Sequence, residues 1–416
     1  MKLALVSSEY PPYHWGGVGS ASHALANLLA IRGHDVHVFT RKHSLPAVRN
    51  HEGIRIHMVR WLKLPMAFAL SFGKNMVPEL NREGGFDAVI IFGNMTLLRR
   101  ADYAALKYPC LTKMCGTWAG ERSALRFGDI SLSSVSGAND LAVLKLSGRY
   151  DKYEDYALLC SDAVIVECDS EIQALNARMA RYLPLLKAGE RSEIGAEGAF
   201  LRERGNVFKQ VQLPDMGNFS PAKRDPAVRR KFAKDGERIL LFVGRLAARK
   251  NVMEAARIFS AHLKARPDDR LMFIGRGNQE GRLQSFAAKN GFSGRMHILR
   301  DLGFEELAVH YANADAFIFP SLWEGFGLVL LEALASGLPV VSRPVGGAPE
   351  VIEKGRNGFL YESDEEAVRA LADCGSLDRS WLVEDVHRRY DLKDNIDNVE
   401  AICRKIASEG KTRSKC

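Results

Sequence analysis

The chain has 416 residues, more than one hydrophobic core usually covers, so two domains are expected. Hydrophobic residues make up 46% and charged residues 26%, as in ordinary folded proteins, and no stretch approaches the roughly 20 apolar residues of a membrane span. The seven cysteines lack the spacing of a zinc site. The net charge of +8 suits an anionic ligand, a phosphate-rich partner, an anionic membrane surface or simply a solvated basic surface.

The first forty residues predict one βαβ unit. A short apolar strand at 2–8 leads into a turn-rich loop at 9–20, a helix at 21–34 and a second strand at 35–40. Further strands of this half are expected at 87–92, 110–115 and 162–167. The opening apolar run is too short for the core of a signal peptide, so we expect a cytoplasmic protein.

The loop Gly16-Gly17-Val18-Gly19 also fits a dinucleotide-binding turn, which would indicate an oxidoreductase. That site needs an acidic residue at the end of the second strand to bind the ribose. The strand ends in Thr40-Arg41 instead, which disfavours NAD, and nothing in the second half fits an NADP enzyme. The chain also lacks the Gly-x-x-x-x-Gly-Lys-Ser/Thr motif of P-loop enzymes.

The strand pattern restarts near residue 239, which predicts a second parallel α/β domain. Its strands are expected at 239–244, 270–275, 296–300, 316–321 and 339–343. The expected organisation is a first domain at 1–212, a linker at 213–226 with three prolines, a second domain at 227–385 and a C-terminal segment at 386–416.

Two cations follow the first strand of the second half. Arg245 comes directly after Gly244, and Lys250 lies five residues later. The carboxyl end of a parallel strand is where open α/β sheets bind ligands, and the planar fork of Arg with the point charge of Lys suits diphosphate oxygens. The alternative is a solvated basic turn.

Two carboxylates, Glu324 and Glu332, flank the segment Gly325-Phe326-Gly327-Leu328. Two glycines before an apolar run predict a helix start whose amides and dipole face an anion. Glu332, two turns into this helix, could then reach a ribose hydroxyl. A Gly346-Gly347 turn follows the next strand at the same sheet edge, although each carboxylate alone could be an ordinary surface group.

These motifs together resemble glycosyltransferase family 4, which has the GT-B fold. The similar segments are GRLAARKN at 244–251, PSLWEGFGLVLLEALASGLPVV at 320–341 and VGGAPEVIEKGRNGFLY at 345–361. Residues 9–40 resemble the family's opening loop and first helix more loosely. The resemblance implies two Rossmann-like doubly wound domains facing each other across a cleft, with a C-terminal segment that crosses back to the first domain.

The resemblance also implies a retaining, metal-independent transfer from a nucleoside-diphosphate sugar, with UDP or GDP as the expected nucleotide and no cofactor. Arg245 and Lys250 would neutralise the departing diphosphate, and Glu324 would bind the donor sugar. The amides of Gly325, Phe326, Gly327 and Leu328 would hold sugar hydroxyls or phosphate, and Glu332 the ribose. Gly16 and Gly17 would approach the phosphate, and Leu299 the base. In agreement, no Asp-x-Asp motif follows a strand.

The sequence departs from the family at one position. Cys115 precedes Gly116 where many members have a His that touches the donor sugar near C6. Residues 92–95 likewise replace a His-containing loop. Two interpretations stay open: a donor sugar that is deoxy or extended at C6, or an ordinary hexose with a tolerated substitution.

The acceptor is less defined by the sequence. We expect a small polar or natural-product acceptor and no nucleic-acid partner, and the oligomeric state is not predicted. Residues 60–76 mix aromatic, aliphatic and basic side chains, so a lipid-linked acceptor at a membrane surface is an alternative. Pro65 and Gly73 disfavour a long amphipathic helix there, and a buried helix is the simpler expectation. A non-catalytic sugar-nucleotide-binding protein is a remote alternative.

Overall fold

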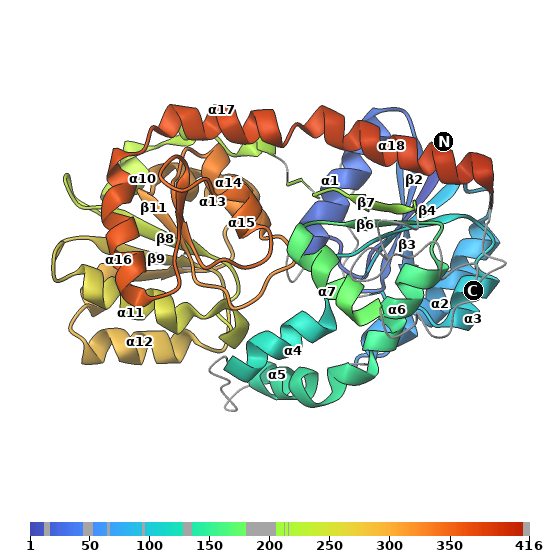
Figure 1. Cartoon of the computed structure of the whole chain (residues 1–416), viewed down its shortest axis with the longest axis horizontal. Coiled ribbons are helices and arrows are strands. Elements are labelled where there is room, and N and C mark those ends of the chain that lie inside the picture. The colour runs from blue at the N-terminus through green and yellow to red at the C-terminus, as the bar shows by residue number, and fades with distance from the viewer. Residues whose placement is uncertain are drawn as a thin grey trace. The chain divides into compact units, whose positions relative to one another are not determined.

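The computed structural model describes residues 1–11, 17–44, 53–64, 67–93, 96–127, 135–179, 205–211, 213–214 and 216–410 (Figure 1). The chain divides into two units. Unit 1 comprises Met1–Ala119, Lys145–Gln212 and Leu392–Cys416, and unit 2 comprises Gly120–Leu144 and Leu213–Asp391. Each unit is built on a parallel sheet flanked by helices, which confirms the predicted pair of Rossmann-like domains.

The sheet of unit 1 has seven parallel strands in the order β3-β2-β1-β4-β5-β6-β7. The strands are β1 (Lys2–Val6), β2 (Asp35–Arg41), β3 (Ile54–Val59), β4 (Ala88–Phe92), β5 (Cys110–Lys113), β6 (Ala163–Val166) and β7 (Val207–Lys209). All five residues of β4 are buried, because helices cover both faces of a doubly wound sheet. Such strands are therefore the continuous apolar runs seen in the sequence.

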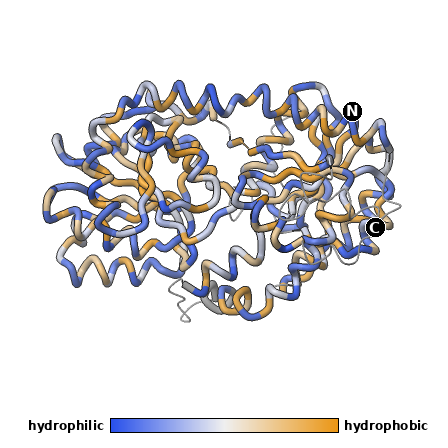
Figure 2. The backbone as a smooth tube through the Cα atoms, in the orientation of Figure 1, coloured by the Kyte–Doolittle hydropathy of each residue, from blue (hydrophilic) through white to orange (hydrophobic). Residues whose placement is uncertain are grey.

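The helices wholly within unit 1 are α1 (Gly17–Ile31), α2 (Phe68–Glu83), α3 (Arg100–Ala105), α6 (Asp151–Cys160), α7 (Asp169–Met179) and α18 (Leu392–Glu409). Hydrophobic residues gather on the strands inside each unit, and the outer surfaces of the helices are largely hydrophilic (Figure 2). The C-terminal helix α18 packs on unit 1 through an apolar stripe that includes Val399 and Ile402. Its Asn395 side chain donates a 2.7 Å hydrogen bond to the carbonyl of Val211.

The sheet of unit 2 has six parallel strands in the order β10-β9-β8-β11-β12-β13. The strands are β8 (Ile239–Val243), β9 (Arg270–Ile274), β10 (Met296–Leu299), β11 (Ala316–Phe319), β12 (Val340–Ser342) and β13 (Gly358–Leu360). The helices wholly within unit 2 are α10 (Pro226–Arg230), α11 (Val252–His262), α12 (Glu280–Lys289), α13 (Phe304–Asn313), α14 (Leu328–Ala335), α15 (Ala348–Val351), α16 (Asp364–Asp373) and α17 (Arg379–Arg389). The strand order reverses between β8 and β11, which makes this pair the switch point of the sheet.

The predicted first domain at 1–212 needs a correction, because residues 120–144 group with unit 2. This segment contains most of α4 (Trp118–Phe127) and α5 (Val135–Leu146). Gly120 packs so closely on Trp323 that an added Cβ would lie 1.9 Å from the indole nitrogen. Glu121 also forms an ion pair with Arg249. These contacts, and not the position in the chain, decide where the segment belongs.

The predicted linker at 213–226 is also part of unit 2. Leu213, Met216 and Phe219 are buried, and the ring of Phe219 packs edge-on against Tyr311 with centroids 5.5 Å apart. The three prolines therefore mark short turns of a packed segment. The polar stretch predicted between the halves at 184–206 lies almost entirely outside the described residues.

Gly73 does not interrupt a helix, contrary to expectation, because α2 runs through both Gly73 and Pro78. An added Cβ at Gly73 would lie 2.2 Å from the carbonyl oxygen of Leu97. The absence of a side chain is what lets α2 approach the loop before α3.

We therefore expect Gly73→Ala to destabilise unit 1 by about 1–3 kcal/mol through overpacking, measured as a lower thermal unfolding midpoint. The matched control is Gly281→Ala on α12, where no atom lies within 4 Å of the added Cβ. That change should leave the midpoint unaltered or raise it, because Ala favours a helix over Gly. Equal midpoints for the two variants would contradict the close approach at Gly73.

Candidate functional site

The candidate site lies at the switch point of unit 2. Strands β8 and β11 are paired in parallel, with Leu240 opposite Ala316, so their carboxyl ends meet at one edge of the sheet. Arg245 and Lys250 follow β8, and Glu324 follows β11. In open α/β sheets the crevice at such a point is where ligands bind. The topology therefore brings together two segments that lie 70 to 80 residues apart in the sequence.

Lys250 and Glu324 form an ion pair at this edge, and their side chains are only 14% and 10% exposed. Lys250 ends a 3-10 turn, Ala248–Lys250, and its ammonium lies over the ring of Phe319 at 5.8 Å. Burial lowers the pKa of Lys250, and Glu324 partly opposes this. Burial opposes ionisation of Glu324 too, but Lys250 and Arg249 outweigh it and hold the pKa of Glu324 below its usual value. Each member of the pair therefore favours the ionised form of the other.

Two further cations surround this pair. Arg245 and Arg249 both lie within electrostatic reach of the Lys250 ammonium. Arg249 also pairs with Glu121 of α4, Nη1 to Oε1 at 3.3 Å, and both side chains are less than one-fifth exposed. Arg245 is predicted from the sequence, whereas Arg249 and Glu121 are not. In the sequence, only its position next to Lys250 pointed to Arg249. Nothing in the sequence pointed to Glu121.

The loop after β11 is held by close backbone packing. Gly327 has a φ of +98° and caps α14, which begins at Leu328. Gly325 and Phe326, predicted as part of the helix start, therefore lie in the preceding loop. The carbonyl of Phe326 accepts a 2.9 Å hydrogen bond from the amide of Gly347. Gly346 would bring an added Cβ within 2.9 Å of the Glu324 Cβ, so the predicted Gly-Gly turn directly supports this loop.

Glu332 lies on α14, in the second turn. Its Oε2 accepts a 2.8 Å hydrogen bond from the hydroxyl of Tyr311 on α13. Burial raises the pKa of Glu332 to about 7, although the Tyr311 hydroxyl opposes that shift. This carboxyl group therefore changes its ionisation near neutral pH. The sequence gave no indication of Tyr311.

The other predicted donor-site residues, Leu299, Gly16 and Gly17, do not belong to the two segments that carry this pair. Leu299 ends β10, the edge strand of the same sheet, and its carbonyl accepts a 2.9 Å hydrogen bond from the amide of Gly275. Gly17 is the exposed first residue of α1 in unit 1. Gly16 lies outside the described residues.

Two family models match the chain. "Glycosyl transferases group 1" matches residues 224–378, and "Glycosyltransferase Family 4" matches residues 15–180. The first match contains the Lys250–Glu324 pair and its supporting loops. The chain belongs to glycosyltransferase family 4. It is therefore an enzyme that transfers glycosyl groups.

Relatives of this glycosyltransferase match along most of its length. An uncharacterised glycosyltransferase of Methanocaldococcus jannaschii is 26% identical over 98% of this chain and 99% of its own. A protein of Mycolicibacterium smegmatis named GDP-mannose-dependent alpha-mannosyltransferase is 26% identical over 88% of this chain and 85% of its own. Among solved structures, sucrose-phosphate synthase from Thermosynechococcus elongatus has a TM-score of 0.71 at 18% identity, covering 98% of this chain and 99% of its own. That likeness shows the shared fold.

Cys115, at the position where many family members have a His, follows β5 in unit 1. It is a partly buried cysteine whose Sγ lies 3.7 Å from the carbonyl oxygen of Lys113. Burial and the nearby Glu167 raise the pKa of its thiol well above the usual value. The following residue, Gly116, has a φ of +101° and donates its amide to Glu171 at 2.9 Å. This position therefore offers a neutral thiol and cannot supply an imidazole's charge.

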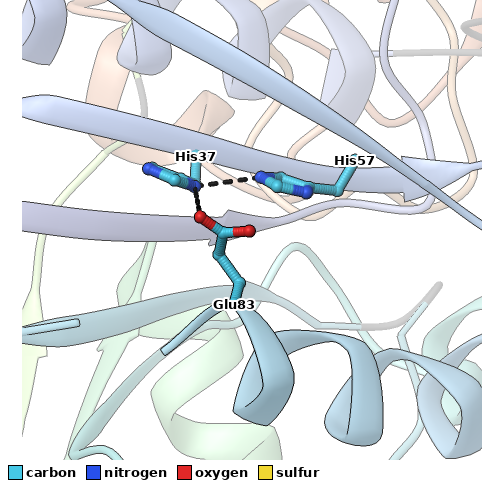
Figure 3. Close-up of side chains that lie close together, drawn as sticks. All are labelled: His37, His57 and Glu83. Carbon is cyan, nitrogen blue, oxygen red and sulfur yellow. Dashed lines mark hydrogen bonds and ion pairs between the residues drawn. The ribbon is translucent and has the colours of Figure 1, made fainter. Parts of the chain in front are cut away.

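A second polar cluster lies in unit 1, where His37, His57 and Glu83 meet (Figure 3). The imidazoles are parallel within 9° with centroids 5.1 Å apart, and His37 Nδ1 lies 2.9 Å from His57 Nε2. The two nitrogens therefore point at each other, as in a hydrogen bond. Two nitrogens bound to one tetrahedral zinc ion, each at roughly 2.0 Å, would lie about 3.3 Å apart, farther than these two nitrogens. This geometry indicates hydrogen-bonded histidines that join β2 to β3.

Across the described residues, no helix is both long and apolar enough to cross a membrane.

If Glu332 binds the ribose of a nucleotide, as expected from the sequence, its raised pKa predicts how nucleotide affinity depends on pH. Ribose hydroxyls donate hydrogen bonds, so they bind the ionised carboxylate better than the protonated acid. Affinity for a nucleoside diphosphate should therefore weaken as the pH falls through about 7, by up to roughly tenfold per pH unit.

Isothermal titration calorimetry from about pH 8 to pH 5.5 measures this dependence. The control is Glu332→Gln. Its affinity for the nucleoside diphosphate should lack the part of the pH dependence that comes from ionisation of Glu332. The ratio of wild-type to variant affinity at each pH cancels the titration of the nucleotide's own phosphate. A ratio that is constant with pH would rule out Glu332 as the ionising group.

Proposed function

We propose that this glycosyltransferase moves a sugar from a UDP- or GDP-linked donor to a small polar or natural-product acceptor, with retention of anomeric configuration and without a metal ion. The observation that carries the proposal is the buried Lys250–Glu324 pair beside Arg245 and Arg249 at the switch point of unit 2. Three cations within electrostatic reach of one another at this sheet edge suit a ligand with several negative charges.

The chemistry follows from where charge develops. As the bond from the anomeric carbon to the diphosphate breaks, negative charge grows on the phosphate oxygen, and Arg245 and Lys250 stabilise it. Glu324 binds the donor sugar and steadies the positive charge on the anomeric carbon. The departing phosphate takes the proton of the acceptor hydroxyl, so no protein base is required. The amides of Phe326, Gly327 and Leu328 hold sugar hydroxyls or the distal phosphate.

The positive charges of Lys250, Arg245 and Arg249 are also the basis for proposing that the transfer needs no metal ion. Enzymes that use Mg²⁺ on a diphosphate neutralise it with the ion, held by carboxylates. Here Lys250 and the two arginines supply positive charge at the equivalent place. The nearby carboxylates of Glu324 and Glu121 are each paired with one of these cations. Their arrangement therefore suits direct cationic binding of the phosphates.

The donor sugar is proposed to differ from glucose or mannose at its C6 end, because Cys115 stands where a His is common. A neutral thiol is smaller than an imidazole and a much weaker hydrogen-bond donor, so it suits a deoxy or extended group. The Mycolicibacterium smegmatis relative is named for GDP-mannose, which makes guanine a candidate base here. Clear preference for UDP-glucose or GDP-mannose in a donor panel would refute the altered sugar.

A lipid-linked acceptor at a membrane surface is the second candidate, favoured by Leu62 and Leu64. They are 57% and 59% exposed and flank the exposed Lys63. If this segment contacts lipid, the enzyme should float with anionic liposomes and with neutral ones less, and Leu62→Ser/Leu64→Ser should reduce flotation. No flotation of the wild type would leave the water-soluble acceptor as the better proposal.

The proposed donor site predicts a nucleotide-specific stabilisation that needs Lys250. In thermal-shift measurements with UDP, GDP, ADP and dTDP, one nucleotide should raise the midpoint by several degrees, equally with EDTA. Lys250→Ala should abolish the shift and lower kcat/KM by roughly 10²–10³, because it removes a group that stabilises the leaving diphosphate.

The control is Lys289→Ala, which removes the same charge from an exposed position at the end of α12. It should keep both the nucleotide shift and the rate. A shift that disappears with EDTA would contradict metal independence. No shift with any nucleotide would overturn the donor site and favour a different function for the cationic cluster.

A further inference from the structure

One buried carboxylate, that of Glu254, joins three segments around the donor site. Glu254 lies in the first turn of α11 and is 2% exposed. Its Oε1 accepts hydrogen bonds from Arg343 Nε at 2.7 Å and from the Tyr361 hydroxyl at 2.8 Å. Its Oε2 accepts from Arg343 Nη2 at 2.8 Å and from Asn251 Nδ2 at 2.6 Å. These four hydrogen bonds all come from donors, and Arg257 Nη2 forms a further ion pair with Oε2 at 3.8 Å.

The contact with Asn251 controls the backbone next to Lys250. Asn251 directly follows Lys250 and has a left-handed φ of +51°, which ends the 3-10 turn and starts α11. Its carbonyl also accepts a 2.9 Å hydrogen bond from the amide of Glu254. A non-glycine residue rarely adopts this conformation without local support. The Glu254 side chain therefore helps to fix the turn that presents Lys250.

The contact with Arg343 controls the loop next to Glu324. Arg343 follows β12 and begins the segment that leads to Gly346 and Gly347. Those glycines pack against Glu324 and Phe326, and the amide of Gly347 bonds the Phe326 carbonyl. A bidentate arginine–carboxylate contact fixes direction as well as distance. Glu254 therefore also sets the position of the loop that supports Glu324.

We propose that Glu254 is a positioning residue for sugar transfer: through Asn251 and Arg343 it sets the spacing between Lys250 and Glu324. This inference rests on the proposed function, because it gives that pair the central role in the reaction. Glu254 does not itself touch the pair. Its effect comes from the geometry of two segments, and misplacement of a reacting group by about 1 Å typically lowers a rate by about 10²-fold.

The variant Glu254→Gln isolates this role with little change of volume. Arg343 donates to both carboxylate oxygens and cannot accept a hydrogen bond, so the amide NH2 of the variant would face an Arg343 donor at either position. The Tyr361 hydroxyl and the Asn251 amide can reorient and accept instead. One of the two Arg343 contacts must then break. The spacing of Lys250 and Glu324 should change while the fold is retained.

The matched control is Glu237→Gln. Glu237 makes a comparable bidentate contact with Arg270, at 2.8 Å to Nε and 2.7 Å to Nη2, with both side chains mostly buried. It lies before β8, at the amino end of the strands and thus at the opposite edge of the same sheet. The two variants therefore disrupt similar ion pairs in unit 2. Of these two ion pairs, only the one between Glu254 and Arg343 supports the site.

The experiment compares the full-length wild type with both variants. It measures the unfolding midpoint, the Kd for the nucleoside diphosphate that stabilises the wild type, and kcat and KM for release of that nucleotide from its sugar donor. Both variants should lower the midpoint similarly. Only Glu254→Gln should lower kcat, by about 10²-fold, with a smaller change in KM, because misalignment acts mainly on the charge that develops in the transition state.

The outcomes separate the two proposals. A wild type that binds no nucleoside diphosphate refutes the proposed function and this inference with it. A wild type that binds and turns over while Glu254→Gln keeps its kcat refutes the positioning role alone. An equal loss of kcat in both variants also refutes it, because general destabilisation would then explain the effect. A selective loss of kcat in Glu254→Gln supports it.

Discussion

The ion pair between Lys250 and Glu324 is the interaction on which the rest of the site depends. The Lys250 side chain is 14% exposed and the Glu324 side chain 10% exposed. Each of the two favours the charged form of the other. A buried charge without its partner is strongly unfavourable, so neither residue can be lost without leaving the other unpaired. The pair also joins the carboxyl ends of β8 and β11. It therefore ties the switch point of the sheet to the place where we propose the diphosphate binds.

The loops that carry this pair owe their rigidity to backbone contacts. Gly327 takes a conformation that a side chain would strain, and Gly346 and Gly347 lie against Glu324 and Phe326 with no room for a Cβ. Glu254 then fixes the segments next to both loops through its hydrogen bonds with Asn251 and Arg343. A site built in this way holds its charges in place before the substrate arrives, which is what electrostatic stabilisation of a transition state requires.

The sequence predicted the parts that depend on local pattern. Continuous apolar runs revealed both parallel sheets, and the order of Arg245, Lys250 and Glu324 around them indicated an anion site. The placement of residues 120–144 could not be predicted, because it depends on contacts such as Gly120 with Trp323 that join distant parts of the chain. The same holds for Glu121, Tyr311 and Glu254. Their roles come from partners 20 to 130 residues away, which no periodicity records.

The cations at the site already have countercharges within unit 2. Glu324 pairs with Lys250, and Glu121 pairs with Arg249, so a diphosphate must share or displace these carboxylates when it binds. Net charge alone therefore says little about affinity, which explains why the overall value of +8 did not identify the ligand. What distinguishes a diphosphate from another anion is the match between its oxygens and three cations in fixed positions. Selectivity then depends on how firmly the loops hold those cations, and hence on buried groups that the substrate never touches.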